Sequence, residues 1–270
     1  MKRTGLKRVI SGILALCFGA VAMFCLFQLS SILLTYRTGA EGYNALTQFV
    51  TRTPEPVGPE EDFTASPDFA ENLPHLPNEM AISFPEVDFA GLAAINPDVV
   101  AWLVLEDTPL NYPLVQGRDN TFYLNHMFDG TQSPVGALFV DSRNAPGFAD
   151  QNTVIYGHHM KDGSMFAVLK NYSNQGFYEE HPQMLLLTPE GNYLVELFAG
   201  YATAITADSW RHSFDDAADF LRWVAEAKHR SDFVSDVELG SSDRVVTLST
   251  CSYVFDNARY VVHGRLVPVA

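Results

Sequence analysis

An uncharged, apolar segment at residues 9–34 constrains this chain more than any other feature of its sequence. A helix of that length rises about 39 Å, at about 1.5 Å per residue, which exceeds the roughly 30 Å hydrocarbon core of a bilayer. The sequence therefore predicts one membrane-spanning helix over residues 9–36. Basic residues gather on the cytoplasmic side of such helices, so we expect residues 1–8 in the cytoplasm and the remaining chain outside the cell. The charged residues that precede the segment are all basic: Lys2, Arg3, Lys7 and Arg8.

Two other interpretations of the apolar segment stay open. Residues 20–22 (Ala-Val-Ala) have the small side chains of a signal-peptidase site, but the apolar run continues past them and exceeds the usual h-region of roughly 7–15 residues. Residues 14–17 (Leu-Ala-Leu-Cys) faintly resemble a lipoprotein box, although Leu16 stands where a small residue is expected. We expect an uncleaved anchor in which Cys17 and Cys25 lie in lipid.

The chain beyond this segment is strongly acidic. It contains all 32 acidic residues and 13 of the 17 basic ones, which gives a formal charge of −19. Such a surface repels polyanions, so we expect neither nucleic acid nor anionic lipid as a partner. Residues 37–85 contain seven prolines among several carboxylates and are predicted to form an extended extracellular stalk, with a short helix over residues 39–50. A folded domain is expected over residues 86–270.

Short apolar and β-branched segments separated by turn residues recur through this domain. This pattern is typical of a barrel or a sandwich of short strands. A domain of this length can bury a sufficient core without disulfides. The candidate strands are residues 102–105, 137–140, 154–156, 184–187, 193–198, 244–248 and 260–266.

One helix is expected after residue 213. Ser213 is a suitable N-cap, and the basic residues 228–230 complement the helix dipole at the other end. The helix is expected to begin with Asp215 and Asp216 in its first turn. Its predicted apolar face consists of Phe214, Ala217, Ala218, Leu221 and either Val224 or Ala225.

Cys251 is the only cysteine outside the apolar segment, so it has no disulfide partner in its own domain. An unpaired cysteine in an exported domain indicates a reactive thiol, although many lone cysteines on strands are small buried hydrophobes. Arg259 lies at the start of the next candidate strand, and His158 follows the candidate strand 154–156. A histidine can exchange a proton with a thiol, and an arginine can bind negative charge on a carbonyl oxygen. Cys251, His158 and Arg259 are therefore a candidate catalytic set.

Four separated motifs surround these residues. They are Asn-Tyr-Pro-Leu-Val-Gln-Gly at 111–117, followed by Asn120 and by Tyr-Leu-Asn at 123–125; Tyr-Gly-His-His-Met at 156–160; Asp-Gly-Ser-Met-Phe at 162–166; and Thr-Leu-Ser-Thr-Cys at 247–251 with Arg259. In this order, over residues 86–268, they resemble the class B sortases, which are cysteine transpeptidases of Gram-positive cell surfaces. The resemblance implies a mainly β domain, an eight-stranded sortase-type barrel with peripheral helices, preceded by one transmembrane helix.

Carried over to this sequence, the resemblance implies a role for each residue of the candidate set. Cys251 is implied to be the nucleophile, His158 its acid/base partner and Arg259 the stabiliser of the oxyanion and of the substrate backbone. No cofactor is implied, and the histidines show no compact zinc-ligand spacing with Cys251, so no metal is expected. The residues implied to contact substrate are Asn120, Leu124, Trp210 and Ser249.

The resemblance also implies a reaction and its partners. An enzyme of this family is expected to cleave a C-terminal sorting motif of secreted proteins after threonine, through a thioester, and to transfer the protein to an amine. The implied amine belongs to a peptidoglycan cross-bridge or to its lipid-linked precursor. A single-pass protein of the cell membrane with an external catalytic domain is suited to this reaction.

Other classes of protein predict different patterns. An L,D-transpeptidase places its nucleophile in a Ser-His-Gly-Cys context that this chain lacks, and papain-like proteases have cysteine before histidine. A non-catalytic adhesin or pilin-like β-domain stays open as an alternative. Such proteins usually carry a sorting motif, an apolar tail and basic residues, a pattern that residues 266–270 do not show.

Overall fold

Eight strands form a closed barrel, which confirms the predicted fold class. The computed structural model describes residues 2–51, 84–251 and 258–269. Neighbouring strands follow the order β10-β8-β7-β3-β4-β5-β6-β9, and β9 pairs with β10 to close the ring. The barrel strands are β3 (Val99–Val104), β4 (Asn111–Val115), β5 (Leu138–Val140), β6 (Asn152–Tyr156), β7 (Gln183–Thr188), β8 (Gly191–Ala204), β9 (Val245–Cys251) and β10 (Ala258–Val269).

The pairing of β6, β9 and β10 determines which strand ends meet. β6 and β9 are parallel, so their C-terminal ends lie at the same edge of the barrel. β10 is antiparallel to β9, so its first residues lie at that edge as well. Three segments that are far apart in the sequence therefore converge at one place.

β4 is the barrel strand that the sequence patterns did not predict. Its sequence begins with Asn111 and contains Pro113, and both residue types are unfavourable in strands. Pairing with β3 on one side and with β5 on the other holds the segment in the sheet. Tertiary pairing thus overrides a weak local preference.

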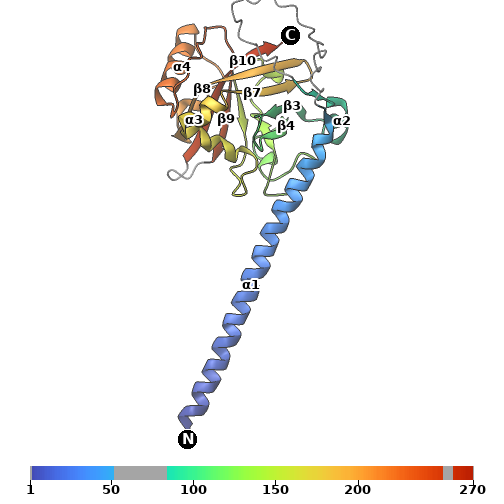
Figure 1. Cartoon of the computed structure of the whole chain (residues 1–270), viewed down its shortest axis with the longest axis vertical. Coiled ribbons are helices and arrows are strands. Elements are labelled where there is room, and N and C mark those ends of the chain that lie inside the picture. Colours follow the sequence, from blue (N-terminus) through green and yellow to red (C-terminus); the bar gives the residue numbers. More distant parts are fainter. Residues whose placement is uncertain (1, 52–83, 252–257, 270) are drawn as a thin grey trace, which may run out of the picture.

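Two apolar cores support the barrel. The larger core contains fully buried side chains such as Trp102, Leu114 and Phe166. The smaller core lies between β8, β9, β10 and the helix α4 (Ala217–Arg230), which stands beside β8 in Figure 1. Burying each large side chain contributes about 1.5–3 kcal/mol, so α4 is held firmly against the barrel.

α4 exists as predicted, but its start and its buried face differ from the prediction. Its N-cap is Asp216, whose carboxylate accepts a hydrogen bond from the backbone N–H of Asp219 at 2.8 Å, so Ser213 is not the cap. Leu221, predicted to be buried, is 38% exposed. The buried face consists instead of Phe220, Trp223, Val224 and Ala227. These residues lie on the side of the helix that packs on β8.

The N-terminal helix α1 (Lys2–Leu46) projects from the barrel as one rod (Figure 1). Among the residues that the structure describes, one helical segment, Leu16–Phe49, is long and apolar enough to cross a membrane. The helix continues without a break past residue 36, and its end packs on the barrel through the buried Tyr43 and Leu46. The first part of the predicted stalk is therefore helical and in contact with the domain.

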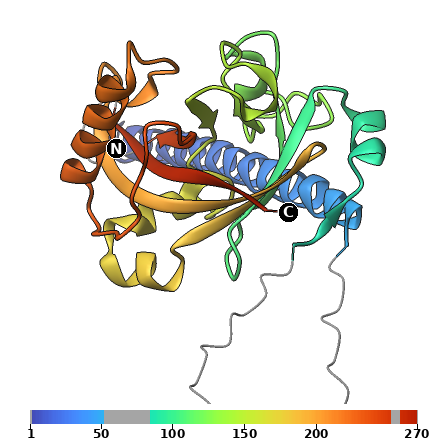
Figure 2. The same ribbon diagram turned by 90° about the horizontal axis from the view of Figure 1, so that it is seen from above.

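A two-stranded ladder follows α1. β1 (Val50–Thr51) pairs antiparallel with β2 (Glu86–Val87), just before the barrel begins. Of the predicted stalk at residues 37–85, residues 52–83 lie outside the described residues. Figure 2 shows that α1 and the start of the barrel domain lie side by side at this point.

The remaining elements are short helices around the barrel. The two α-helices are α2 (Phe89–Ile95), capped by Asp88, and α3 (Gln175–Glu180), capped by Asn174. The 3₁₀ segments are η1 (Thr47–Phe49), η2 (Phe122–Leu124), η3 (Pro146–Phe148), η4 (Phe166–Ser173) and η5 (Asp208–Trp210).

Candidate active site

The three predicted catalytic residues lie at the barrel edge where β6, β9 and β10 meet. Arg259 is the register partner of Cys251 in the antiparallel pair of β9 and β10. In the parallel pair of β6 and β9, Tyr156 is the register partner of Ser249. His158 follows Tyr156 by two residues, as Cys251 follows Ser249 by two. The strand register thus brings together three backbone positions that are far apart in the sequence.

Gly157 permits the chain to leave β6 at this edge. Its N–H donates to the Ser249 carbonyl at 3.1 Å and extends the contact with β9 by one residue. A Cβ at this position would lie 2.3 Å from Leu138 Cδ2 and 2.6 Å from Phe166 Cδ2. Only glycine fits between these two buried side chains. The close packing at Gly157 therefore sets the backbone position of the next residue, His158.

The imidazole of His158 is oriented by a backbone carbonyl. Its Nε2 lies 2.7 Å from the carbonyl oxygen of Leu124, at the end of η2. A carbonyl can only accept, so Nε2 carries a proton and Nδ1 is the nitrogen left to exchange one. This tautomer suits a histidine that works as a general acid and base.

A pocket of about 490 Å³ opens at the same edge. The four residues predicted to contact substrate all line it, together with His158 and Arg259. In the described part of the chain, no group of three His, Cys, Asp or Glu side chains could hold a metal ion. The lining residues are Asn120, Leu124, Phe139, Arg143, Tyr156, Gly157, His158, Ile205, Ala207, Asp208, Trp210, Arg211, Ser249, Thr250 and Arg259.

Trp210 and Ser249 join two walls of this pocket. The indole N–H of Trp210, in η5, donates to the Ser249 hydroxyl in β9 at 3.0 Å. Ser249 is 2% exposed, and the bond to Trp210 is partly buried at the pocket wall. Trp210 also packs against the core beneath α4. It therefore links the loop between β8 and α4 to the strand that carries Cys251.

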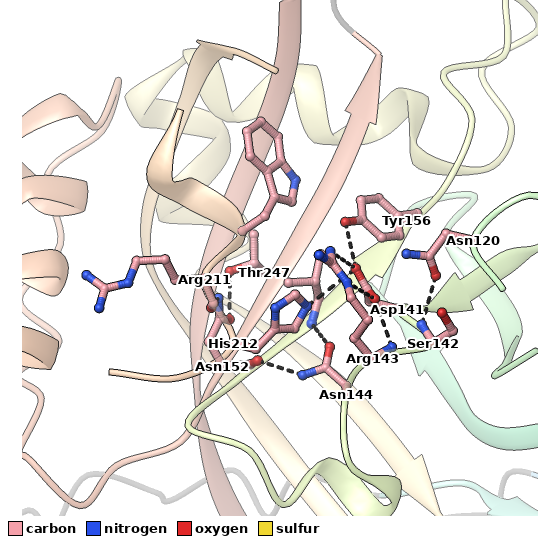
Figure 3. A network of polar contacts seen from close by, with 12 residues as sticks. Asn120, Asp141, Ser142, Arg143, Asn144, Asn152, Tyr156, Arg211, His212 and Thr247 are labelled. Carbon is pink, nitrogen blue, oxygen red and sulfur yellow. Dashed lines mark hydrogen bonds and ion pairs between the residues drawn. The ribbon is translucent and has the colours of Figure 1, made fainter. Parts of the chain in front are cut away.

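A buried carboxylate, Asp141, supports other side chains of the pocket wall and was not predicted. Arg143 donates to it from Nε at 3.0 Å and from Nη2 at 2.7 Å, and the Tyr156 hydroxyl donates at 3.0 Å (Figure 3). Asn120 accepts a hydrogen bond from the Ser142 N–H at 2.8 Å in the same cluster. These contacts fix three of the pocket-lining side chains.

The charge of Asp141 is strongly favoured. Burial by itself would raise the pKa of this carboxyl group. Hydrogen bonds from Arg143 first, and from Asn120 and Tyr156 as well, outweigh burial and hold the pKa well below its ordinary value. His212 Nε2 also lies 3.4 Å from the carboxylate. The sequence feature that could have indicated this cluster is the run of polar residues 141–144, which directly follows a predicted strand.

A second chain of buried polar groups holds the loop after η5. Asn152 donates to the Arg211 carbonyl at 2.7 Å and accepts from the Thr247 hydroxyl at 2.8 Å (Figure 3). Thr247 also contacts His263 Nδ1 at 2.8 Å. Burial lowers the pKa of His263 to about 3, so this histidine is neutral and structural. The loop that carries Trp210 is thus tied to the barrel interior.

The sequence of this chain is similar to those of known proteins. The sortase domain family matches residues 103–267. Sortase B of Listeria monocytogenes is 39% identical over 178 residues, which are 65% of this chain and 72% of that protein. The chain belongs to the class B sortases. Sortase B of Staphylococcus aureus is 37% identical over 184 residues, which are 67% of this chain and 75% of that protein.

Solved sortase B structures share the fold. The Staphylococcus aureus sortase B–substrate complex has a TM-score of 0.65 at 37% identity, over 67% of this chain and 85% of that chain. Clostridium perfringens sortase B has a TM-score of 0.63 at 35% identity, over 66% and 99% of the two chains. Class B sortases are cysteine transpeptidases, so this chain is an enzyme of that type and not a non-catalytic β-domain.

Proposed function

We propose that Cys251 is the nucleophile of this transpeptidase, with His158 as its acid/base partner and Arg259 as the stabiliser of the oxyanion. The observation that carries the proposal is the pocket whose wall contains His158, Arg259 and Thr250, the residue before Cys251. A free thiol is only slightly ionised near neutral pH, so a neighbouring histidine and a fixed cation increase its reactivity. The strand register supplies both neighbours.

The reaction has two steps. The Cys251 thiolate attacks the carbonyl carbon of a threonine, the C–N bond of the peptide breaks, and His158 protonates the departing amine. Arg259 stabilises the negative charge on the carbonyl oxygen during the attack. A second amine then attacks the resulting thioester, passes a proton to His158, and releases the thiolate with a new amide bond.

The donor substrate is a secreted protein with a C-terminal sorting motif, bound along the pocket by Asn120, Leu124, Trp210 and Ser249. The acceptor is an amine of a peptidoglycan cross-bridge or of its lipid-linked precursor. Two solved sortase B structures support this pairing, one from Staphylococcus aureus solved as a substrate complex and one complexed with triglycine. No cofactor takes part in either step.

The enzyme is a single-pass protein of the cell membrane. α1 crosses the bilayer at residues 9–36, with residues 1–8 in the cytoplasm and the catalytic domain, residues 86–270, outside. The length and apolar character of α1 support this arrangement, together with the basic residues before it. Anchoring keeps the pocket where exported substrates and wall precursors both occur.

Mass spectrometry of the full chain in detergent micelles tests the proposal. The protein is incubated with a library of threonine-containing pentapeptides, and an acyl-enzyme is expected on Cys251. Adding triglycine should release the acyl group as an amide. Cys251→Ala should form no acyl-enzyme while its Tm stays within about 2 °C of the wild type, because the change removes a single sulfur atom. Peptide cleavage by this variant at the wild-type rate would contradict the cysteine mechanism.

A further inference from the structure

The last turns of α1 dock closely on the segment of residues 127–136. A Cβ on Gly39 would lie 2.9 Å from a methyl group of Val135, and a Cβ on Gly42 would lie 2.8 Å from Met127 Cε. A larger side chain at Gly39 would meet the short, branched side chain of Val135, whereas one at Gly42 would have to move the flexible end of Met127. The two glycines thus allow α1 to approach the barrel domain at this point.

Tyr43, on the same helix face, reaches the backbone that encloses His158. Its hydroxyl donates to the Gly136 carbonyl at 2.6 Å, and the side chain is 5% exposed. A Cβ on Gly136 would lie 2.9 Å from His158 Cδ2 and 3.0 Å from the Leu124 carbonyl oxygen. That oxygen is the acceptor for His158 Nε2. The peptide held by Tyr43 therefore forms part of the wall against which the imidazole rests.

A second path connects Tyr43 with the other side of the His158 loop. Its ring packs edge-on against Tyr112, with centroids 5.1 Å apart. The Tyr112 hydroxyl accepts a hydrogen bond from the Met165 N–H at 3.4 Å. The next residue, Phe166, donates its N–H to the His158 carbonyl at 2.9 Å. Tyr43 thus contacts one segment that confines His158 directly and is linked to the other through Tyr112.

We propose that Tyr43 is a positioning residue for His158, so that the end of the membrane helix is a structural part of the active site. This inference rests on the proposed catalytic role of His158. The hydrogen bond to Gly136 holds the wall peptide, and the wall peptide sets the angle of the imidazole. A catalytic domain without the end of α1 lacks this support and leaves Val135 and Met127 uncovered.

The first test compares two tyrosine variants of the full chain in detergent micelles. Tyr43→Phe keeps the ring and removes the bond to Gly136. Tyr172→Phe is the matched control, because the buried Tyr172 hydroxyl also donates to a backbone carbonyl, that of His181 at 2.9 Å. We expect Tyr43→Phe to lower the kcat of acylation about threefold to tenfold, the effect of one buried hydrogen bond, with little change in KM. It should also displace the limb of the pH profile of kcat/KM that reports the histidine. Tyr172→Phe should change neither quantity.

A second pair of variants tests the docking itself. Gly39→Leu should separate α1 from Val135 and reproduce the kinetic effect of Tyr43→Phe. Thr38→Leu, at the neighbouring exposed position, should not. Equal kcat values and pH profiles for Tyr43→Phe and Tyr172→Phe would overturn the inference. His158→Asn separates this failure from that of the proposed function, since full activity of His158→Asn would contradict the catalytic assignment itself.

Discussion

Arg259 and Cys251 are register partners on adjacent strands, so the sheet itself sets their spacing. Paired residues of antiparallel strands have Cα atoms roughly 4.5–5.5 Å apart, which brings the guanidinium within reach of an acyl group on the thiol. The planar guanidinium offers several donors in a fixed fork, whereas an ammonium group is a compact, strongly hydrated point charge. The geometry of the charge, and not only its sign, should therefore matter at this position.

Arg259→Lys tests that expectation. The variant keeps the positive charge but loses the fork, so the rate of acylation should fall about 100-fold or more, the effect of losing one oxyanion donor. The rate is measured as acyl-enzyme formation in single-turnover mass spectrometry. An unchanged rate of acylation would show that Arg259 lines the pocket without stabilising the oxyanion.

Trp210 should contribute to motif selectivity. It lines the pocket and is tied to Ser249, whereas Trp102 is fully buried in the larger core, does not line the pocket and serves as the matched control. Trp210→Ala should change the relative kcat/KM among motif variants with little change in Tm, because selectivity is a difference in transition-state binding. Trp102→Ala should lower the free energy of unfolding by about 3–5 kcal/mol without changing selectivity. A uniform loss across all peptides with a large drop in Tm would identify Trp210 as core.

Asp141 predicts an acid-dependent loss of stability. Its pKa is lower in the folded protein than in the unfolded chain, so its charge stabilises the fold fully above about pH 4 and progressively less as the pH falls further. Asp141→Asn should lower the free energy of unfolding by about 2 kcal/mol at pH 7. The Tm difference between this variant and the wild type should stay constant from pH 7 to about pH 5 and shrink below about pH 4. Parallel Tm curves over the whole range would contradict a role for the charge.

Among the secondary-structure elements, α4 holds the loop that carries Trp210. Its buried side chains pack on the outside of β8 and β10, and Trp223 Nε1 donates to the Asp208 carbonyl in η5 at 3.0 Å. Arg211, in the same loop, pairs with Asp219 in the first turn of α4. The position of one pocket wall therefore depends on where this helix begins.

The start of α4 can be tested with two substitutions. Asp216→Ala removes the N-cap and should lower the free energy of unfolding by about 1 kcal/mol. Ser213→Ala should change it by less than about 0.5 kcal/mol, as an ordinary surface substitution does. Urea denaturation measures both values. A larger effect at Ser213 than at Asp216 would show that the helix begins earlier in solution.

In the whole molecule, the anchor and the catalytic domain are joined more directly than the sequence predicted. Leu34, the last residue of the uncharged segment, precedes Tyr43 by nine residues, which is about 14 Å along a helix. β1 and β2 then pair residue 51 with residue 86, so the chain leaves and re-enters the domain at one place. The spacing between helix and barrel is thus set by the docked end of α1.

Replacing residues 52–83 with a four-residue Gly-Ser turn tests this view. Both ends of the segment are already held by β1 and β2, so kcat should be unchanged. The shorter closure should raise the free energy of unfolding by about 1–2 kcal/mol, at about 0.6 kcal/mol for each halving of length. Activity and Tm of the full chain are the measurements. A large drop in either would show that the segment supports the fold.

Several features of this protein are determined by the sequence alone. The uncharged run at residues 9–34 predicts a helix of membrane-span length, because hydropathy is a property of consecutive residues. Most barrel strands are found as short β-branched runs for the same reason. The motifs around His158 and Cys251 indicate the family, since chemistry needs particular side chains in a particular order. All of these signals are local.

Other features were decided only by tertiary contacts. β4 is a strand because two neighbours pair with it, in spite of Pro113. Asp216 caps α4, and the buried face is chosen by the surface on which that helix packs. The hydrogen bond from Tyr156 to Asp141 and the hydrogen bond from Tyr43 to Gly136 join residues that are far apart in the sequence. Such contacts follow from strand order and packing, which a linear pattern does not encode.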